Sequence, residues 1–260
     1  MQEPGEVTKE EKRPDLGKET EQKNAGPDFG QVWDWSLTQG TEEEPAEKRV
    51  FEHNLSKQDE LIPEMLDFLR NRLGDKFSID PILEEGDWPD RPAMIGIDGR
   101  CGSGKTSFAK LLSTYVPCNV VHMDDFYIPM EKRRKDWREV PGGNIDFHRL
   151  LSEVLHPLYH GKPVFYRAYN CREDKLEETM EMRPRRYIIV EGTYSLHFLL
   201  SRAYDLKIFT DISPEDQIQN LREREGDNLE KFIEQWIPME ENYFKEFSVR
   251  QRSHAIINWR

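Results

Sequence analysis

The stretch Ala93–Thr106, AMIGIDGRCGSGKT, decides the fold of this 260-residue chain. An apolar run of strand length leads into a glycine-rich turn, and apolar residues at helical spacing follow. Gly99, Gly104, Lys105 and Thr106 match the pattern G-x-x-x-x-G-K-[ST], the phosphate-binding loop or Walker A motif. The stretch therefore predicts a strand over Ala93–Asp98, a phosphate-binding turn, and a helix over Lys105–Tyr115.

The residue types in this loop fit the binding of a nucleoside triphosphate. Glycines let the backbone wrap around phosphates with its N–H groups pointing inward, and the following helix N-terminus adds positive potential. Lys105 is expected to reach the β- and γ-phosphates, and Thr106 to offer its hydroxyl to Mg²⁺. With ATP and Mg²⁺ as cofactors, the predicted nucleotide-binding residues are Gly99, Arg100, Cys101, Gly102, Ser103, Gly104, Lys105, Thr106 and Ser107.

Strands and helices alternate along the rest of the chain. Strands are predicted over 119–124, 186–192, 205–211 and 254–258, and helices over 146–161, from Ser213 onward, and over 229–247 with a kink at Pro238. Residues 162–170 are predicted to form a strand or one arm of a hairpin. This order predicts an α/β fold of the P-loop NTPase class, with a mostly parallel sheet covered by helices on both faces in three layers.

Carboxylates stand where two of these strands end. Asp124 and Asp125 follow the second strand, and Glu191 ends the apolar run YIIVEG. Ligands of open α/β sheets bind at the carboxyl ends of the strands, so one aspartate can act as a general base and Glu191 can serve Mg²⁺. The alternatives are that an aspartate caps a turn and that Glu191 is simply exposed at a strand end.

Composition excludes several classes of protein. The net charge of −13 argues against a general nucleic-acid binder. We find no apolar run approaching the ~20 residues of a membrane span and no signal-peptide pattern, and therefore expect a cytoplasmic protein. Cys101, Cys118 and Cys171 are widely spaced and fit neither a disulfide framework nor a zinc site. Four scattered histidines, among them His122 and His254, are interpreted as structural or exposed.

From Pro92 onward the chain resembles the uridine kinase family of P-loop kinases, which also includes phosphoribulokinase, pantothenate kinase and nicotinamide riboside kinase. The motifs that carry the resemblance are GRCGSGKT, MDDFY, GGNIDFHRL, IIVEGTY and LRERE, in this order. Five motifs in order are far more specific than the phosphate loop alone. The resemblance implies an ATP-dependent small-molecule kinase.

The resemblance also implies roles for individual residues. Asp124 aligns with the catalytic aspartate, Lys105 with the phosphate lysine, and Arg222 and Arg224 with lid arginines that stabilise transition-state charge. For the arginines the alternative is a solvated helix face. The implied acceptor-binding residues are Tyr127, Asp146, Arg167 and Asn170, with Asp146 holding ribose hydroxyls; the implied metal-site residues are Thr106, Asp124 and Glu191.

Three segments depart from the uridine kinase pattern. Asn170 stands where a histidine that helps recognise the pyrimidine is expected, and the lid segment LREREGDN is shorter than in typical uridine kinases. The run QWIPMEENYF is more similar to nicotinamide riboside kinases. These differences concern the identity of the acceptor rather than phosphoryl transfer.

The predicted organisation has three parts. Residues 1–49 form an acidic, disordered tail with a patch around Trp33 and Trp35, residues 50–91 form an amphipathic helix over 61–73 and a linker, and residues 92–260 form the P-loop kinase domain. The predicted partner is a small-molecule acceptor, with no nucleic acid or membrane; a homo-oligomer is compatible with the sequence.

The leading functional hypothesis is phosphoryl transfer from ATP to a hydroxyl of a nucleoside or riboside. One rival is a kinase for a non-nucleoside alcohol such as pantothenate or a sugar phosphate. A second rival is a non-catalytic module that senses ATP and signals through its tail. The joint presence of Asp124, Glu191 and the lid arginines argues against the second rival, because binding alone does not need them together.

Overall fold

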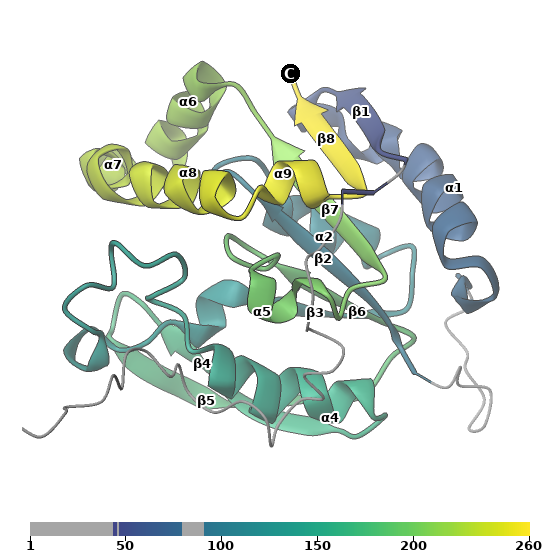
Figure 1. The fold of residues 1–260 in the computed structure, drawn as a ribbon, viewed down its shortest axis with the longest axis horizontal. Helices are drawn as coiled ribbons and strands as arrows, with labels where there is room; N and C mark the ends of the chain where they lie inside the picture. Colours follow the sequence, from purple (N-terminus) through teal and green to yellow (C-terminus); the bar gives the residue numbers. More distant parts are fainter. Residues whose placement is uncertain (1–43, 46, 80–90) are drawn as a thin grey trace, which may run out of the picture.

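The computed structural model describes residues 44, 45, 47–79 and 91–260, so the Trp33/Trp35 patch lies outside the described residues. Its main sheet has six strands in the order β1-β8-β7-β2-β6-β3, and every neighbouring pair is parallel (Figure 1). The strands are β1 Arg49–His53, β2 Ala93–Gly99, β3 Cys118–His122, β6 Tyr187–Glu191, β7 Leu206–Asp211 and β8 Ala255–Trp259. The predicted parallel α/β sheet is confirmed.

Helices cover both faces of this sheet because its strands are apolar on both sides. In β2, Ile95 and Ile97 pack with α1 and α2, whereas Met94 faces the cluster that holds Tyr243. The α-helices are α1 Ile62–Leu73, α2 Lys105–Leu112, α3 Phe147–Arg149, α4 His156–Tyr159, α5 Phe198–Ser201, α6 Pro214–Glu225, α7 Leu229–Lys231, α8 Ile237–Glu246 and α9 Val249–Arg252. The result is the three-layer α/β/α arrangement that alternating strands and helices predict.

Local sequence signals set the ends of several helices. Ser213 accepts a hydrogen bond from the Asp216 N–H at 3.1 Å and caps α6, as predicted. Gly74 ends α1 with a φ of +54°, a conformation that favours glycine. Short 3₁₀ turns link other elements: η2 Leu55–Leu61, η3 Gly74–Lys76, η4 Met123–Phe126, η5 Met130–Lys132 and η7 Gly226–Asn228.

Two wider π-helical turns precede prolines. They are η6 (Leu150–Leu155), ahead of Pro157, and η8 (Phe232–Trp236), ahead of Pro238. Proline offers no N–H and its ring crowds the carbonyl four residues earlier, so a local change of hydrogen-bond pattern relieves the conflict. The helix predicted over 229–247 therefore contains a π turn just before Pro238.

The structure differs from the predicted elements in three places. Arg49–His53 forms an edge strand, β1, where the sequence predicts the end of a tail and the start of a linker. β3 ends at His122, and Asp124 lies in the turn η4 that follows. Residues 162–170 pair as β4 (Val164–Asn170) with an unpredicted strand, β5 (Lys175–Met182), in an antiparallel hairpin separate from the main sheet.

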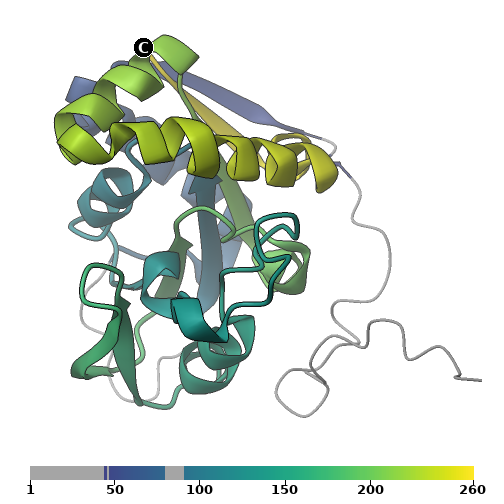
Figure 2. The same ribbon diagram turned by 90° about the vertical axis from the view of Figure 1, so that its left-hand side faces the viewer.

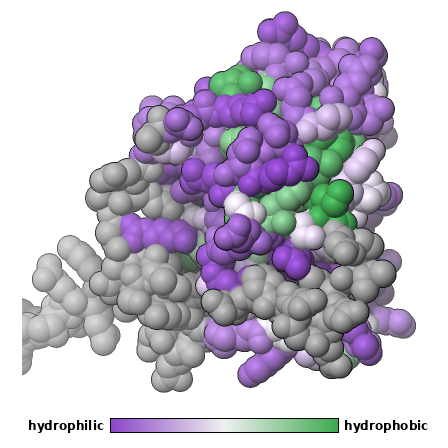
Figure 3. All heavy atoms as spheres, turned by 90° about the vertical axis from the view of Figure 1, so that its right-hand side faces the viewer, coloured by the Kyte–Doolittle hydropathy of each residue, from purple (hydrophilic) through white to green (hydrophobic). Residues whose placement is uncertain are grey.

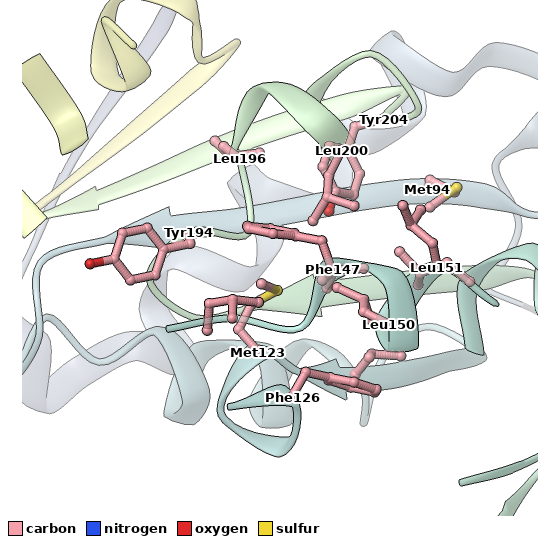
Figure 4. Packing of buried hydrophobic residues seen from close by; sticks show 14 of the residues in the cluster. Met94, Met123, Phe126, Phe147, Leu150, Leu151, Tyr194, Leu196, Leu200 and Tyr204 are labelled. Carbon is pink, nitrogen blue, oxygen red and sulfur yellow. The ribbon is translucent and has the colours of Figure 1, made fainter. Parts of the chain in front are cut away.

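The core lies on both sides of the sheet. Figure 4 shows Met123, Phe147 and Leu150 gathered beside β2.

The hairpin β4–β5 lies low in the molecule, away from α6 and α8 (Figure 2). The face that carries α1 is largely hydrophilic, with a group of hydrophobic residues between polar ones (Figure 3). Among the described residues, no helix is long and apolar enough to cross a membrane.

Acidification is expected to destabilise the fold through His197, which is 4% exposed and stacks on Phe147 with ring centroids 4.4 Å apart. Burial lowers the pKa of His197 to about 3, against the opposing effect of a hydrogen bond to the Pro141 carbonyl. The unfolded chain, with a pKa of about 6.5, binds a proton first, so the free energy of unfolding falls as pH drops below ~6.5. This residue alone contributes up to ~1.4 kcal/mol per pH unit in that range.

The measurement is urea unfolding of the wild type and His197→Asn at pH 7, 6 and 5. Asparagine keeps a side-chain acceptor for the Leu199 N–H but does not titrate. The variant is expected to be less stable at pH 7 and to lose less stability on acidification. Equal losses in both proteins would show that His197 is not the titrating group.

Candidate active site

The phosphate loop joins β2 to α2 with three glycines at positive φ: Gly99 at +144°, Gly102 at +78° and Gly104 at +75°. A Cβ at Gly99 would lie 2.0 Å from the Thr210 carbonyl oxygen, so that position has room only for glycine. The Lys105 ammonium is nearly buried and donates to the carbonyls of Gly99 (2.7 Å) and Arg100 (2.8 Å). The Lys105 side chain therefore lies against the backbone of the loop. The phosphates that it is predicted to contact are expected to bind to the same loop.

The predicted metal-site residues Thr106 and Glu191 are in contact. The Thr106 hydroxyl donates to the Glu191 carboxylate, with its oxygen 3.0 and 3.1 Å from the two acceptor oxygens. His122 Nδ1 lies 2.5 Å from the same carboxylate, and this hydrogen bond raises the pKa of His122. His122, interpreted from the sequence as structural or exposed, is thus hydrogen-bonded to a predicted metal-site residue. Strands β3 and β6 pair in register at His122 and Glu191, and only this pairing reveals the contact.

Asp124 and Asp125 have separate surroundings. Nearby protein atoms and the charge of Glu191 raise the pKa of Asp124, although its side chain still reaches solvent. The Tyr127 hydroxyl forms a hydrogen bond with Asp124. Asp125 instead accepts a hydrogen bond from the Tyr166 hydroxyl at 2.9 Å. Asp124 is therefore the more accessible of the two carboxylates, whereas Asp125 is tied to the hairpin.

Backbone pairing brings Asp146 to the same side of the sheet. Tyr127 and Ile145 form an antiparallel bridge, and the Asp146 N–H donates to the Phe126 carbonyl at 2.7 Å. One oxygen of Asp146 caps α3 by accepting from the Arg149 N–H at 2.9 Å. The other carboxylate oxygen has no hydrogen bond among the described residues, so Asp146 serves the helix and retains an acceptor.

Aromatic rings gather around Tyr127. The Trp236 ring, from the π turn η8, lies 6.3 Å from the Tyr127 ring and 5.9 Å from that of Trp137. The guanidinium of Arg133 lies over both Tyr127, at 5.8 Å, and Trp137, at 4.6 Å. Next to Asp124 and Asp146, the structure thus assembles aromatic faces and a cation from three separate segments.

The predicted acceptor residues Arg167 and Asn170 are engaged within the hairpin. Arg167 donates to the Leu176 carbonyl at 2.7 Å, and to that of Glu177. Asn170 accepts from the backbone N–H groups of the turn that follows it. In that turn, burial first and then the charge of Asp124 raise the pKa of Cys171 to about 11.

The predicted lid arginines lie on α6, which follows β7. Both Arg222 and Arg224 are exposed. Arg224 pairs with Glu225 at 2.6 Å and lies over the Phe232 ring at 5.6 Å. It also lines a hollow beside the phosphate loop, whereas Arg222 does not. The geometry thus distinguishes two arginines that the sequence treats alike.

Two buried carboxylates that sequence analysis missed join the loop to α8. Asp98 accepts from the Leu196 N–H (2.9 Å) and the Tyr243 hydroxyl (2.7 Å), and burial raises its pKa to about 6. Glu240 accepts from the Cys101 N–H at 2.9 Å and from the Gln217 amide at 2.8 Å. α8 also carries Glu241 and Glu246, so the sequence pattern did not distinguish Glu240 from its neighbours. Asp98 and Glu240 therefore fix the position of the phosphate loop relative to α8.

Burial also changes the interpretation of Cys101. Its thiol donates to Glu240 at 3.3 Å, and burial raises its pKa to about 12. A thiol held in the protonated form is a poor nucleophile, so Cys101 acts here as a packed, hydrogen-bonded residue of the loop.

The donor set at Thr106, Glu191 and Asp124 suits Mg²⁺. A hydroxyl and two carboxylates are hard oxygen ligands of the kind this ion prefers, and Mg²⁺ usually keeps several waters and binds substrate phosphates through few protein groups. Thr106 and Glu191 are in direct contact, and the charge of Glu191 contributes, after burial, to the raised pKa of Asp124.

Comparison with known proteins yields one family. A family model described as the phosphoribulokinase/uridine kinase family matches residues 94–259. A uridine kinase from Lactobacillus helveticus is 28% identical over 185 residues, covering 65% of this chain and 86% of the relative. A uridine kinase from Bacillus cytotoxicus is 29% identical over 164 residues, or 57% of this chain and 76% of the relative.

The fold is shared with solved structures. A protein described as a possible uridine kinase from Bacillus stearothermophilus superposes with a TM-score of 0.53 at 21% identity, covering 75% of this chain and 98% of that one. A D-glycerate 3-kinase from Cryptococcus neoformans gives a TM-score of 0.52 at 14% identity, covering 76% and 95%. At these identities the two structures support the fold alone.

Proposed function

Because this chain belongs to the phosphoribulokinase/uridine kinase family and is accordingly an ATP-dependent small-molecule kinase, we propose that its acceptor is the hydroxyl of a nucleoside or riboside. The observation that carries this proposal is the set of aromatic rings around Tyr127, next to Asp124 and Asp146. Planar rings bind a base by stacking, and a carboxylate accepts two hydrogen bonds from a vicinal diol.

In this mechanism each residue acts on one part of the reaction. Asp124 accepts the proton of the attacking hydroxyl, and the raised pKa gives it more basicity than an ordinary aspartate. Lys105 leaves the carbonyls of Gly99 and Arg100 and contacts the β- and γ-phosphates. Thr106, Glu191 and Asp124 would hold Mg²⁺, which supplies charge neutralisation when bound with ATP. Positioning and electrostatics account for most of the catalysis in phosphoryl transfer.

Roles for the remaining predicted residues follow from their positions. Tyr127 and Asp146 hold the acceptor. Arg167 and Asn170 stabilise the hairpin β4–β5, whose turn borders the acceptor site. Arg224 is the principal lid arginine, because it lies beside the phosphate loop. We place the reaction in the cytoplasm, where ATP is the abundant donor.

The relatives with the fold of this chain include a D-glycerate 3-kinase, so a non-nucleoside acceptor is the alternative. The aromatic rings beside Asp124 favour the nucleoside, because a small hydroxy acid offers no surface to stack on them.

The test measures ADP release with nucleosides, ribosides, pantothenate, glycerate and sugar phosphates as acceptors. Turnover is expected only with acceptors in which a planar base is attached to a ribose. Turnover confined to glycerate or a sugar phosphate would contradict the proposal, and ATP binding without turnover on any acceptor would favour the sensing module.

Asp146→Asn sharpens the test, because asparagine keeps the α3 cap and removes the charge. We expect KM for the preferred nucleoside to rise roughly tenfold or more, since a hydrogen bond to a charged group contributes ~1.5–3 kcal/mol. The KM of the corresponding 2′,3′-dideoxynucleoside, which lacks the diol, is expected to be nearly unchanged by the substitution. Equal effects on both compounds would show that Asp146 does not hold the diol.

A further inference from the structure

We propose that the 3₁₀ helix η2, which precedes the segment matched by the family model, forms one wall of the site for the base of the donor nucleotide. The family model begins at residue 94, whereas η2 spans Leu55–Leu61. The inference rests on the proposed function, because it concerns the donor of the same reaction. It assigns a binding role to a segment outside the kinase domain proper.

The site is a hollow of about 260 Å³ beside the phosphate loop. Three segments line it: η2, the loop with the start of α2, and the middle of α6. The lining residues are Leu55, Gln58, Gly102, Gly104, Ser107, Asn220 and Arg224. This volume is slightly below the ~300–1,000 Å³ of complete small-molecule sites, so it suits one part of a ligand whose phosphates lie on the loop.

The hollow lies on the donor side of the loop. Asp124 follows β3 and Glu191 is the last residue of β6, and both strands lie on one side of β2 in the sheet. η2 and α6 follow β1 and β7, which lie on the other side. The backbone of the loop cradles the α- and β-phosphates, while the lysine reaches toward the γ-phosphate. The nucleoside end of the donor therefore extends away from the acceptor, toward the hollow.

β1 and β8 hold η2 against the loop. The Leu55 N–H lies 3.4 Å from the Arg260 carbonyl oxygen, just past the end of β8. The Gln58 amide donates to the Gly104 carbonyl at 3.4 Å, and a Cβ at Gly104 would lie 2.6 Å from Leu55 Cδ1. η2 is therefore in direct contact with the loop, and the pairing of β1 with β8 sets its position.

The residues around the hollow suit a base with an exocyclic amino group, such as adenine. Gln58 and Asn220 donate their amide N–H groups to the loop carbonyls of Gly104 and Gly102. Within the described part of the chain their amide oxygens have no hydrogen-bond donor, so they remain acceptors for the amino group of a base. Leu55 offers an apolar edge to the same base.

The experiment compares two ligands by calorimetry: Mg·ATP, which has a base, and Mg·tripolyphosphate, which has only the phosphates. The proteins are the wild type, Leu55→Ala, Gln58→Ala and the control Lys57→Ala. Lys57 lies on the same η2 helix, but its side chain is 59% exposed and pairs with Glu60. We expect each of the two wall variants to bind ATP roughly tenfold more weakly and tripolyphosphate as the wild type does, with the control unchanged for both.

Each outcome has a distinct meaning. Unchanged ATP binding in both wall variants overturns the inference, and so does an equal loss for ATP and tripolyphosphate, since that would mark a distorted loop. Retained tripolyphosphate binding shows that a variant is folded at the site. A wild type that binds neither ligand would instead overturn the proposed use of ATP, which is a separate failure.

Discussion

Replacing Asp124 by asparagine is expected to lower kcat by at least about a hundredfold, because asparagine cannot accept the proton of the attacking hydroxyl. General bases contribute ~10²–10⁴-fold to such reactions. Asp124 lies in η4, directly after β3, and its side chain is exposed to solvent. The loop makes the phosphate contacts, and Thr106 and Glu191 remain to hold Mg²⁺, so ATP binding measured by calorimetry should fall much less than kcat.

Asp125→Asn is the matched control for this experiment. Asp125 adjoins Asp124 in sequence but accepts a hydrogen bond from Tyr166 of the hairpin. The control variant should keep most of its turnover, with a modest loss of stability from the weakened bond. If Asp125→Asn lost more activity than Asp124→Asn, the assignment of the base would be reversed.

The second large effect is expected from Glu240→Ala, which should lower the free energy of unfolding by on the order of 3 kcal/mol. Glu240 is 2% exposed and accepts from the Cys101 N–H and the Gln217 amide. Alanine leaves the Cys101 N–H without an acceptor, and of the two N–H groups of the Gln217 amide only the one that donates to the Cys101 carbonyl at 3.0 Å keeps its partner. Each buried N–H left unpaired costs ~1–3 kcal/mol. The loop loses its tie to α8, so ATP affinity should fall as well. Urea unfolding and calorimetry measure the two effects.

The neighbouring Glu241 supplies the matched control. It pairs with the loop residue Arg100, but its side chain is 44% exposed, and exposed ion pairs contribute ~0–1 kcal/mol. Glu241→Ala should therefore unfold almost as the wild type does. Similar losses in the two variants would mean that the negative charge of α8, rather than the buried hydrogen bonds of Glu240, stabilises the loop.

The sequence predicted the parallel sheet, its three layers, the phosphate loop and the start of α6. These features depend on short-range signals: glycine spacing, apolar periodicity, and a serine cap followed by proline. The family was also predictable, because five motifs occur in the expected order. The positions of Asp124 and Glu191 near one another followed from the rule that ligands bind at the carboxyl ends of parallel strands.

Other features depended on pairing between distant segments. β1 is a polar edge strand without a strong apolar pattern, and it forms because β8 offers it a partner. β5 is mostly exposed and forms against β4. Elements of this kind receive much of their stability from neighbours that the local sequence does not reveal.

The sequence by itself determined the phosphate-binding motif, because that motif lies within nine consecutive residues. Tertiary structure alone decided which other residues serve it: His122 against Glu191, Glu240 behind Cys101, and η2 against Gly104. The residues in these three contacts are 69, 139 and 46 positions apart in the sequence, respectively. Hydrogen bonding and packing act over a few ångströms in space, and only the folded chain brings such residues within that range.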